Sequence, residues 1–226
     1  MSGMLTMTTD KRELSKVGFD RDAGGYDQSP KYAALRSSYG KIADEALRGR
    51  FNTWLDVGCG TGALLALIRE RRREAQLFGI DLSDRMIEIA RTKLGTAADL
   101  RVSDSETIPF QSGRFDLITC TFSFHHYPHP RAVLSEMLRV LSPNGRVIIA
   151  DPSPFPPLRQ ILNLLVPVSR DGTVRFYSKK EMGNLVQSAG LAVSTWTKLD
   201  WYSSMLVAQR RALPAEPMGR SSRISP

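Results

Sequence analysis

A glycine-rich segment is the part of this chain with the clearest potential to bind a ligand. Residues 55–63 read LDVGCGTGA, so Gly58, Gly60 and Gly62 follow a short apolar stretch and precede a helical pattern. Glycines permit a tight turn and let a ligand approach the backbone closely. Gly58, Gly60 and Ala63 also satisfy the dinucleotide pattern G-x-G-x-x-G/A, so the loop alone does not select one ligand.

Asp56 separates the candidate ligands. It ends the predicted strand, beside the position where a dinucleotide would place its pyrophosphate. A carboxylate there repels a dianion, although the N-terminus of the following helix attracts one. The same carboxylate suits a ligand that carries both an ammonium and a sulfonium group. S-adenosylmethionine is such a ligand, and we expect it to be the cofactor.

More candidate binding residues follow the next two predicted strands. Asp81 lies 25 positions after the first carboxylate and can accept hydrogen bonds from both hydroxyls of a ribose, or it is a turn or helix-cap carboxylate. Leu82 and Met86 could flank an adenine ring, although such residues more often belong to a core. Asp104 and Ser105 could hydrogen-bond the adenine, or they cap a turn.

All three histidines of the chain come directly after a predicted strand, in the segment FHHYPHP. A histidine at the carboxyl end of a parallel strand can act as a base near neutral pH. The alternative is a local turn whose imidazoles cap the next helix or bond to the backbone. Among His125, His126 and His129 we favour His126 as the catalytic residue, with His125 next. Because adjacent residues do not easily converge on one ion, we expect no metal.

These residues need a scaffold, and the order of elements supplies one. Strands are predicted at 53–57, 76–81, 99–103, 115–121 and 146–150, with helices at 31–48, 63–73, 131–141 and 178–189, and another capped by Ser83. Two final strands are predicted at 191–199 and 201–209. This alternation is typical of an α/β fold, a mainly parallel sheet with helices on both faces.

Three segments in this order resemble a known family. LDVGCGTGALL, GIDLSDRMIEIAR and the run from FDLITC to IIADP are similar to motifs of the class I S-adenosylmethionine-dependent methyltransferases, in particular the "type 11" small-molecule group. The resemblance covers roughly residues 15–151. It implies a Rossmann-like, doubly wound seven-stranded sheet that is mainly parallel, with the last strand antiparallel and the cofactor over the carboxyl ends of the strands.

The resemblance also assigns residues to the cofactor site. By match to the family motifs these are Asp56, Gly58, Gly60, Gly62, Asp81, Leu82, Asp104, Ser105 and Thr121. The segment FDRDAGGYDQS resembles the family's lid, in which an aromatic side chain covers the methionine end of the cofactor. Tyr26 is the candidate for that aromatic residue.

The acceptor is narrowed mainly by departures from related patterns. YDQSPKYAALRSSYG does not match the signature of quinone methyltransferases, which disfavours a quinone ring. The Asn/Asp-Pro-Pro-aromatic motif of nucleic-acid amino-methyltransferases is absent, since residues 121–124 read TFSF. We expect a small acceptor, and the apolar character of a lid insertion at 151–177 favours a hydrophobic or aromatic metabolite.

The remaining features set the context. We predict an N-terminal helical extension at 1–50, a methyltransferase domain at 51–210 and a disordered tail at 211–226. The formal net charge is +8, but no aromatic-interleaved basic motif accompanies it, so we expect no nucleic-acid partner. Cys59 and Cys120 are expected to be free thiols in a cytoplasmic protein, and no apolar stretch is long enough to span a bilayer. Nothing in the sequence indicates the oligomeric state.

Two other functions fit parts of the same pattern. A nicotinamide-dependent oxidoreductase would use the same glycine loop, but Asp56 disfavours it. A regulator that binds the cofactor without turnover would keep both the glycine loop and Asp81. The glycine loop therefore predicts cofactor binding more firmly than it predicts catalysis.

Overall fold

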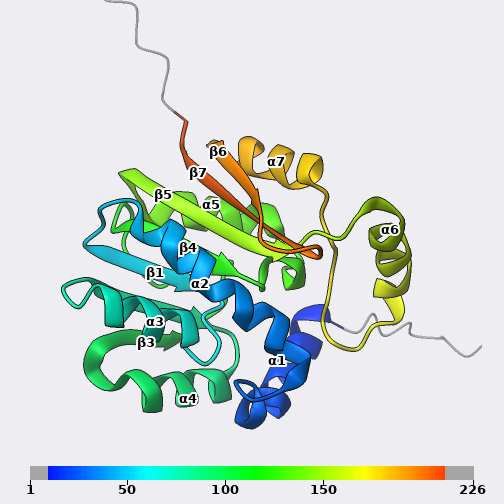
Figure 1. Cartoon of the computed structure of the whole chain (residues 1–226), viewed down its shortest axis with the longest axis horizontal. Coiled ribbons are helices and arrows are strands. Elements are labelled where there is room, and N and C mark those ends of the chain that lie inside the picture. The colour runs from blue at the N-terminus through cyan, green and yellow to red at the C-terminus, as the bar shows by residue number, and fades with distance from the viewer. Residues whose placement is uncertain (1–9, 212–226) are drawn as a thin grey trace, which may run out of the picture.

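Seven strands form a single sheet in the computed structural model, which describes residues 10–211 (Figure 1). The strands are β1 (Thr53–Val57), β2 (Gln76–Asp81), β3 (Ala98–Val102), β4 (Phe115–Thr121), β5 (Leu141–Pro152), β6 (Leu191–Lys198) and β7 (Ser203–Arg210). Their order is β3-β2-β1-β4-β5-β7-β6, and β7 alone runs antiparallel to its neighbours. The predicted sheet, with its antiparallel last strand, is confirmed.

Helices cover both faces of this sheet. They are α1 (Lys11–Asp22), α2 (Ala33–Leu47), α3 (Ala63–Arg71), α4 (Asp84–Leu94), α5 (Pro130–Val140), α6 (Pro156–Leu165) and α7 (Lys179–Ser188). The apolar faces of α2, α3 and α4 form one core with the sheet, and those of α5 and α7 form a second core on its other side. Neither α1 nor α6 contributes a side chain to either core.

The strand β5 differs from its prediction. Pro143-Asn144-Gly145 reads as a helix stop followed by a turn, yet the strand already begins at Leu141. Leu141 is buried and pairs with Phe115, whereas the next pair joins Leu117 to Arg146. Pro143-Asn144-Gly145 therefore form a bulge-like interruption inside a longer strand. The strand extends back past them because Leu141 pairs with Phe115.

The ends of the chain are only partly described. Residues 1–9 of the predicted extension lie outside the described part, as does the predicted tail apart from Arg211, whose N–H donates to the Gly190 carbonyl. Within residues 10–211 no helix is both long and apolar enough to cross a membrane.

The topology creates the crevice in which ligands of such sheets bind. β1 and β4 are adjacent, but α3, which follows β1, packs on one face, while α5, which follows β4, packs on the other. At such a switch point the connections leave in opposite directions, so the carboxyl ends of the strands stay open. The glycine loop and the histidines follow these two strands.

Substitution of Gly62 tests whether the glycine loop must pack closely against α4. Its φ of 72° is left-handed, and a Cβ there would lie 3.0 Å from Leu94 and 3.2 Å from Ala90 of α4. We expect Gly62→Ala to lower the free energy of unfolding by about 1–2 kcal/mol, measured by urea denaturation. The control, Gly183→Ala, lies in α7 with open space around it. It should stabilise the protein by up to about 1 kcal/mol. Equal effects of the two changes would contradict this account.

Candidate functional site

A pocket of about 960 Å³, including its open mouth, lies at the carboxyl ends of the first four strands. Eleven of the residues expected to bind ligand or catalyse line it: Tyr26, Asp56, Gly58, Gly60, Asp81, Leu82, Met86, Asp104, Ser105, Thr121 and His126. Gly62 and His125 do not.

The glycine loop is held open by its backbone. The N–H groups of Gly58 and Cys59 both donate to the carbonyl of Ile80, at 2.8 and 2.9 Å, which ties the loop to β2. A Cβ on Gly58 would lie 2.5 Å from the hydroxyl of Ser123, whereas the space around Gly60 is open. Gly58 therefore allows a close packing contact, and Gly60 leaves room for a ligand against the backbone.

Asp81 joins the glycine loop to the next helix. Its carboxylate accepts from the N–H of Gly60 at 2.8 Å and from the N–H of Ser83 at 2.9 Å. Burial nevertheless raises the pKa of Asp81 above its ordinary value. Ser83 in turn accepts from the N–H of Met86 and caps α4, as the sequence predicts. Asp81 can therefore serve both as a turn carboxylate and as a ribose ligand, because a carboxylate oxygen keeps a second lone pair for a ribose hydroxyl.

Asp56 is a buried acid with no cation among its contacts in the described part of the chain. Its side chain is 1% exposed and accepts from the hydroxyl of Thr119 at 2.5 Å, while the indole N–H of Trp54 donates to Thr119 at 2.9 Å. Burial raises the pKa of Asp56 to about 7, and the nearby Asp81 adds to the shift. An ammonium group placed in the pocket would relieve this burial cost, so the site fits the amino-acid end of S-adenosylmethionine.

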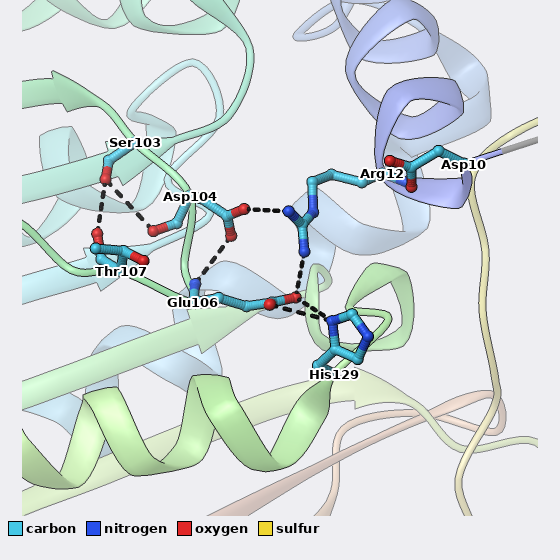
Figure 2. A network of polar contacts seen from close by, with 7 residues as sticks. All are labelled: Asp10, Arg12, Ser103, Asp104, Glu106, Thr107 and His129. Atoms are coloured by element: carbon cyan, nitrogen blue, oxygen red, sulfur yellow. Dashed lines mark hydrogen bonds and ion pairs between the residues drawn. The ribbon is translucent and has the colours of Figure 1, made fainter.

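A network of charges closes the opposite side of the pocket (Figure 2). Arg12 of α1 pairs with Asp104 at 2.9 Å and with Glu106 at 2.6 Å. Glu106 also contacts Nδ1 of His129 at 3.0 Å, and Asp104 accepts from the N–H of Glu106. Asp104 therefore does cap a turn, and it also holds α1 against the pocket.

Several residues of this pocket cannot be found from sequence. Arg12, Lys16 and Phe19 of α1 line it, and no local pattern connects them with residues 81–106. Phe19 lies edge-on to Tyr26, with ring centroids 6.3 Å apart, and edge-on to His126 at 5.1 Å. The predicted lid aromatic, Tyr26, stacks on Tyr32 at 4.0 Å, so it belongs to a cluster of rings.

The adjacent histidines occupy different environments. Nδ1 of His125 lies 2.9 Å from Oδ1 of Asp151, and the His125 ring stacks on Phe176. His126 lines the pocket with a buried Nδ1 that has no hydrogen-bond partner within residues 10–211. Burial lowers the pKa of His126 to about 3, so this imidazole stays neutral. The carboxylate partner that would make a histidine a better base thus belongs to His125, whereas the sequence analysis favours His126 as the catalytic residue.

The apolar segment after β5 does not line this pocket. None of residues 152–177 contributes to the wall, and α6 has no buried residue. The segment contacts both α1 and the histidine turn: Nζ of Lys11 donates to the carbonyls of Val166 and Ser169 at 2.7 and 2.8 Å, and the N–H groups of Val174 and Arg175 donate to the carbonyl of His125. The predicted acceptor lid therefore borders α1 and His125 without lining the pocket.

Comparison with known proteins agrees with this geometry. Residues 55–149 match the family model described as "Methyltransferase domain". A demethylmenaquinone methyltransferase of Deinococcus radiodurans is 34% identical over 155 residues, 66% of this chain and 63% of that protein. Nocamycin O-methyltransferase of Saccharothrix syringae is 37% identical over 112 residues, 47% of this chain and 40% of that protein. The chain thus spans only about half of the length of such relatives.

Solved structures show the same fold. A putative methyltransferase of Haloferax volcanii, in complex with the activator Trm112, superimposes with a TM-score of 0.71 at 20% identity, covering 86% of this chain and 98% of that one. The 1,6-didemethyltoxoflavin-N1-methyltransferase of Burkholderia thailandensis, solved with S-adenosylhomocysteine, gives 0.69 at 16% identity, covering 94% of each.

The domain match, the sheet order and the acids beside the glycine loop agree with one class of protein. Residues 55–149 are similar to a methyltransferase domain, and the fold is that of the class I S-adenosylmethionine-dependent methyltransferases, as the resemblance predicts. S-adenosylmethionine is the cofactor of this class, and the described residues fit it.

Asp56 provides the sharpest test of the fit. In the ligand-free protein, Asp56→Asn should stabilise the fold at pH 8 by on the order of 2 kcal/mol, because the raised pKa makes the ionised acid unfavourable. With a folded pKa of about 7 against an ordinary 3.8, this gain should fade as the pH falls below 7 and vanish near 4. The same variant should bind S-adenosylmethionine at least tenfold more weakly by calorimetry. Unchanged affinity would exclude the ammonium contact.

Proposed function

We propose that the protein transfers the methyl group of S-adenosylmethionine to a small hydrophobic or aromatic metabolite, and that His125 removes a proton from the acceptor. One observation supports the base most directly: Nδ1 of His125 lies 2.9 Å from the buried carboxylate of Asp151. A carboxylate in that position fixes the tautomer and stabilises the imidazolium that forms.

Binding of the donor is assigned to the acids and the glycine loop. Asp56 faces the ammonium group, Asp81 accepts from the ribose hydroxyls, and Gly60 leaves room at the backbone. Leu82 and Met86 flank the adenine, while Asp104 and Ser105 lie at its edge. When bound, the donor supplies a methyl carbon that its sulfonium already activates, so the protein need only align the acceptor and exclude water.

The two adjacent histidines have different roles in the proposed reaction. With a proton on Nδ1 shared with Asp151, the lone pair of His125 is on Nε2. His125 lies behind the pocket wall, with its ring 4.1 Å from that of His126, so the proposal requires the acceptor to approach past His126 for its proton to reach Nε2 as the new bond to the methyl carbon forms. His126 stays neutral beside the pocket, which keeps a second positive charge away from the sulfonium.

The acceptor class is supported by the aromatic side chains of the pocket. Phe19, Tyr26, Tyr39 and Phe122 line it together with His126, so a flat apolar molecule finds aromatic surfaces there. A hydroxyl or an acidic ring carbon would supply the proton that a base removes. Relatives named for methylation of demethylmenaquinone and of nocamycin support a ring-containing acceptor. The departure from the quinone signature still argues against a quinone ring.

The proposal is tested by a screen followed by matched variants. Phenols, enols and hydroquinones are offered with S-adenosylmethionine, and release of S-adenosylhomocysteine is measured. For an acceptor that turns over, His125→Ala and Asp151→Asn should each lower kcat by about 10²–10⁴-fold, while cofactor affinity stays unchanged. His129→Ala is the control, since this exposed histidine contacts Glu106 instead.

Two results would contradict the proposal. Full turnover by His125→Ala together with loss of turnover by a His126 variant would move the base to His126. Absence of product with every acceptor, despite tight cofactor binding, would favour a binding protein without catalysis.

A further inference from the structure

Most of the exposed large apolar side chains of the described chain lie outside the methyltransferase site. It consists of Phe155, Ile161, Leu164, Leu165, Val168 and Trp201, and we call it the α6 patch. These are six of the eight large apolar side chains recorded as exposed. Leu164, Val168 and Trp201 are 79%, 76% and 71% exposed, although apolar side chains of this size usually seek burial.

The α6 patch is built from two segments that meet. The N–H of Ser153 donates to the carbonyl of Tyr202 at 2.7 Å, which places Trp201 close to the start of α6. Further along, the side-chain amide of Asn163 bonds to both the N–H and the carbonyl of Phe176, so the helix is held in a fixed orientation. Figure 1 shows α6 at the margin of the molecule, away from the sheet. Its apolar side is therefore presented outward by specific contacts.

The helical segment of the α6 patch carries charge of one sign. Residues 155–170 contain no acidic side chain and carry Arg159 and Arg170. Neither arginine forms an ion pair within residues 10–211. Two acids border the patch: Asp171, which accepts from the N–H of Thr173 and the hydroxyl of Ser169, and Asp200 beside Trp201, which accepts from Ser203. The apolar side chains of the segment are thus accompanied by two unpaired positive charges.

We propose that the α6 patch docks the protein onto the surface of an anionic lipid membrane. An amphipathic helix with leucines on one side and basic residues beside them lies in the headgroup region, where an exposed tryptophan is also favoured. The net charge of +8 adds a long-range attraction. A second copy of the chain is a poorer occupant, because a twofold contact would bring Arg159 and Arg170 of each copy against a surface of the same sign.

Vesicle flotation tests the proposal with the full chain and requires no turnover, so its outcome is independent of the proposed methyl transfer. Wild-type protein should float with vesicles of phosphatidylcholine and phosphatidylserine and should bind pure phosphatidylcholine at least tenfold more weakly. Leu164→Ser/Val168→Ser should lower partitioning at least tenfold. Val102→Ser, an exposed valine of β3 at the far edge of the sheet, should have little effect.

A second pair of variants isolates the charge. Arg159→Gln/Arg170→Gln should weaken partitioning by about ten- to thirtyfold, at roughly 1 kcal/mol for each arginine near an anionic surface. The matched control, Arg69→Gln/Arg73→Gln, removes the same charge at the end of α3 and its following turn, on the opposite side of Figure 1, and should bind nearly as wild type. Circular dichroism and thermal unfolding check that each variant is folded.

Tryptophan fluorescence locates the contact. Insertion should shift the emission of the exposed Trp201 to shorter wavelength, and Trp201→Phe should remove that shift. Equal partitioning of the patch and control variants would overturn the proposal, since binding would then come from charge elsewhere. A wild-type dimer that Leu164→Ser/Val168→Ser makes monomeric, without vesicle binding, would assign the α6 patch to a second copy instead.

Discussion

Two carboxylates at one end of the sheet, the buried Asp56 and the partly buried Asp81, are the constraint on which this site depends. The parallel register of β1 and β2 sets Asp56 opposite Gly79, two residues before Asp81, so both acids meet at the same end of the sheet. Burial raises the pKa of both acids, Asp81 raises that of Asp56 further, and no cation lies in their immediate contacts within residues 10–211. The folded protein therefore carries an electrostatic cost that a positively charged, hydroxyl-bearing ligand removes. At these two positions, a change that stabilises the ligand-free protein is therefore expected to weaken ligand binding.

The surrounding structure keeps these acids in place by neutral donors rather than by counter-ions. Thr119 and Trp54 form a chain of hydrogen bonds to Asp56, and two backbone N–H groups hold Asp81. Donors of this kind fix the orientation of a carboxylate without cancelling its charge. That leaves the charge available for a ligand. In the proposed acceptor site the arrangement is reversed, since there a carboxylate, that of Asp151, orients the ring of His125.

The sequence is sufficient for the parts of the molecule that depend on local patterns. The glycine loop, the serine cap of α4 and nearly every strand can be read from spacing and periodicity, because neighbours along the chain determine them. Arg12 and its acids are 92 and 94 positions apart, and the partner of His125 is 26 positions away, so only the fold brings them together. The orientation of α6 shows another limit. Its periodicity indicates an apolar face, but an inward and an outward face have the same pattern.

The helix α1 differs from every other wall of the pocket in how it is held. Its one buried side chain is that of Ser15, and its ion pairs to other parts of the pocket join Arg12 to Asp104 and Glu106 and Lys16 to Asp84. Hydrogen bonds from Lys11 and the ring contacts of Phe19 complete its attachment. Ion pairs weaken as dissolved salt accumulates around them, whereas packed apolar cores do not. Ionic strength should therefore act on one wall of the site while the sheet stays intact. A ligand enclosed by α1 would be exchanged faster in concentrated salt even if the ligand itself carried no charge.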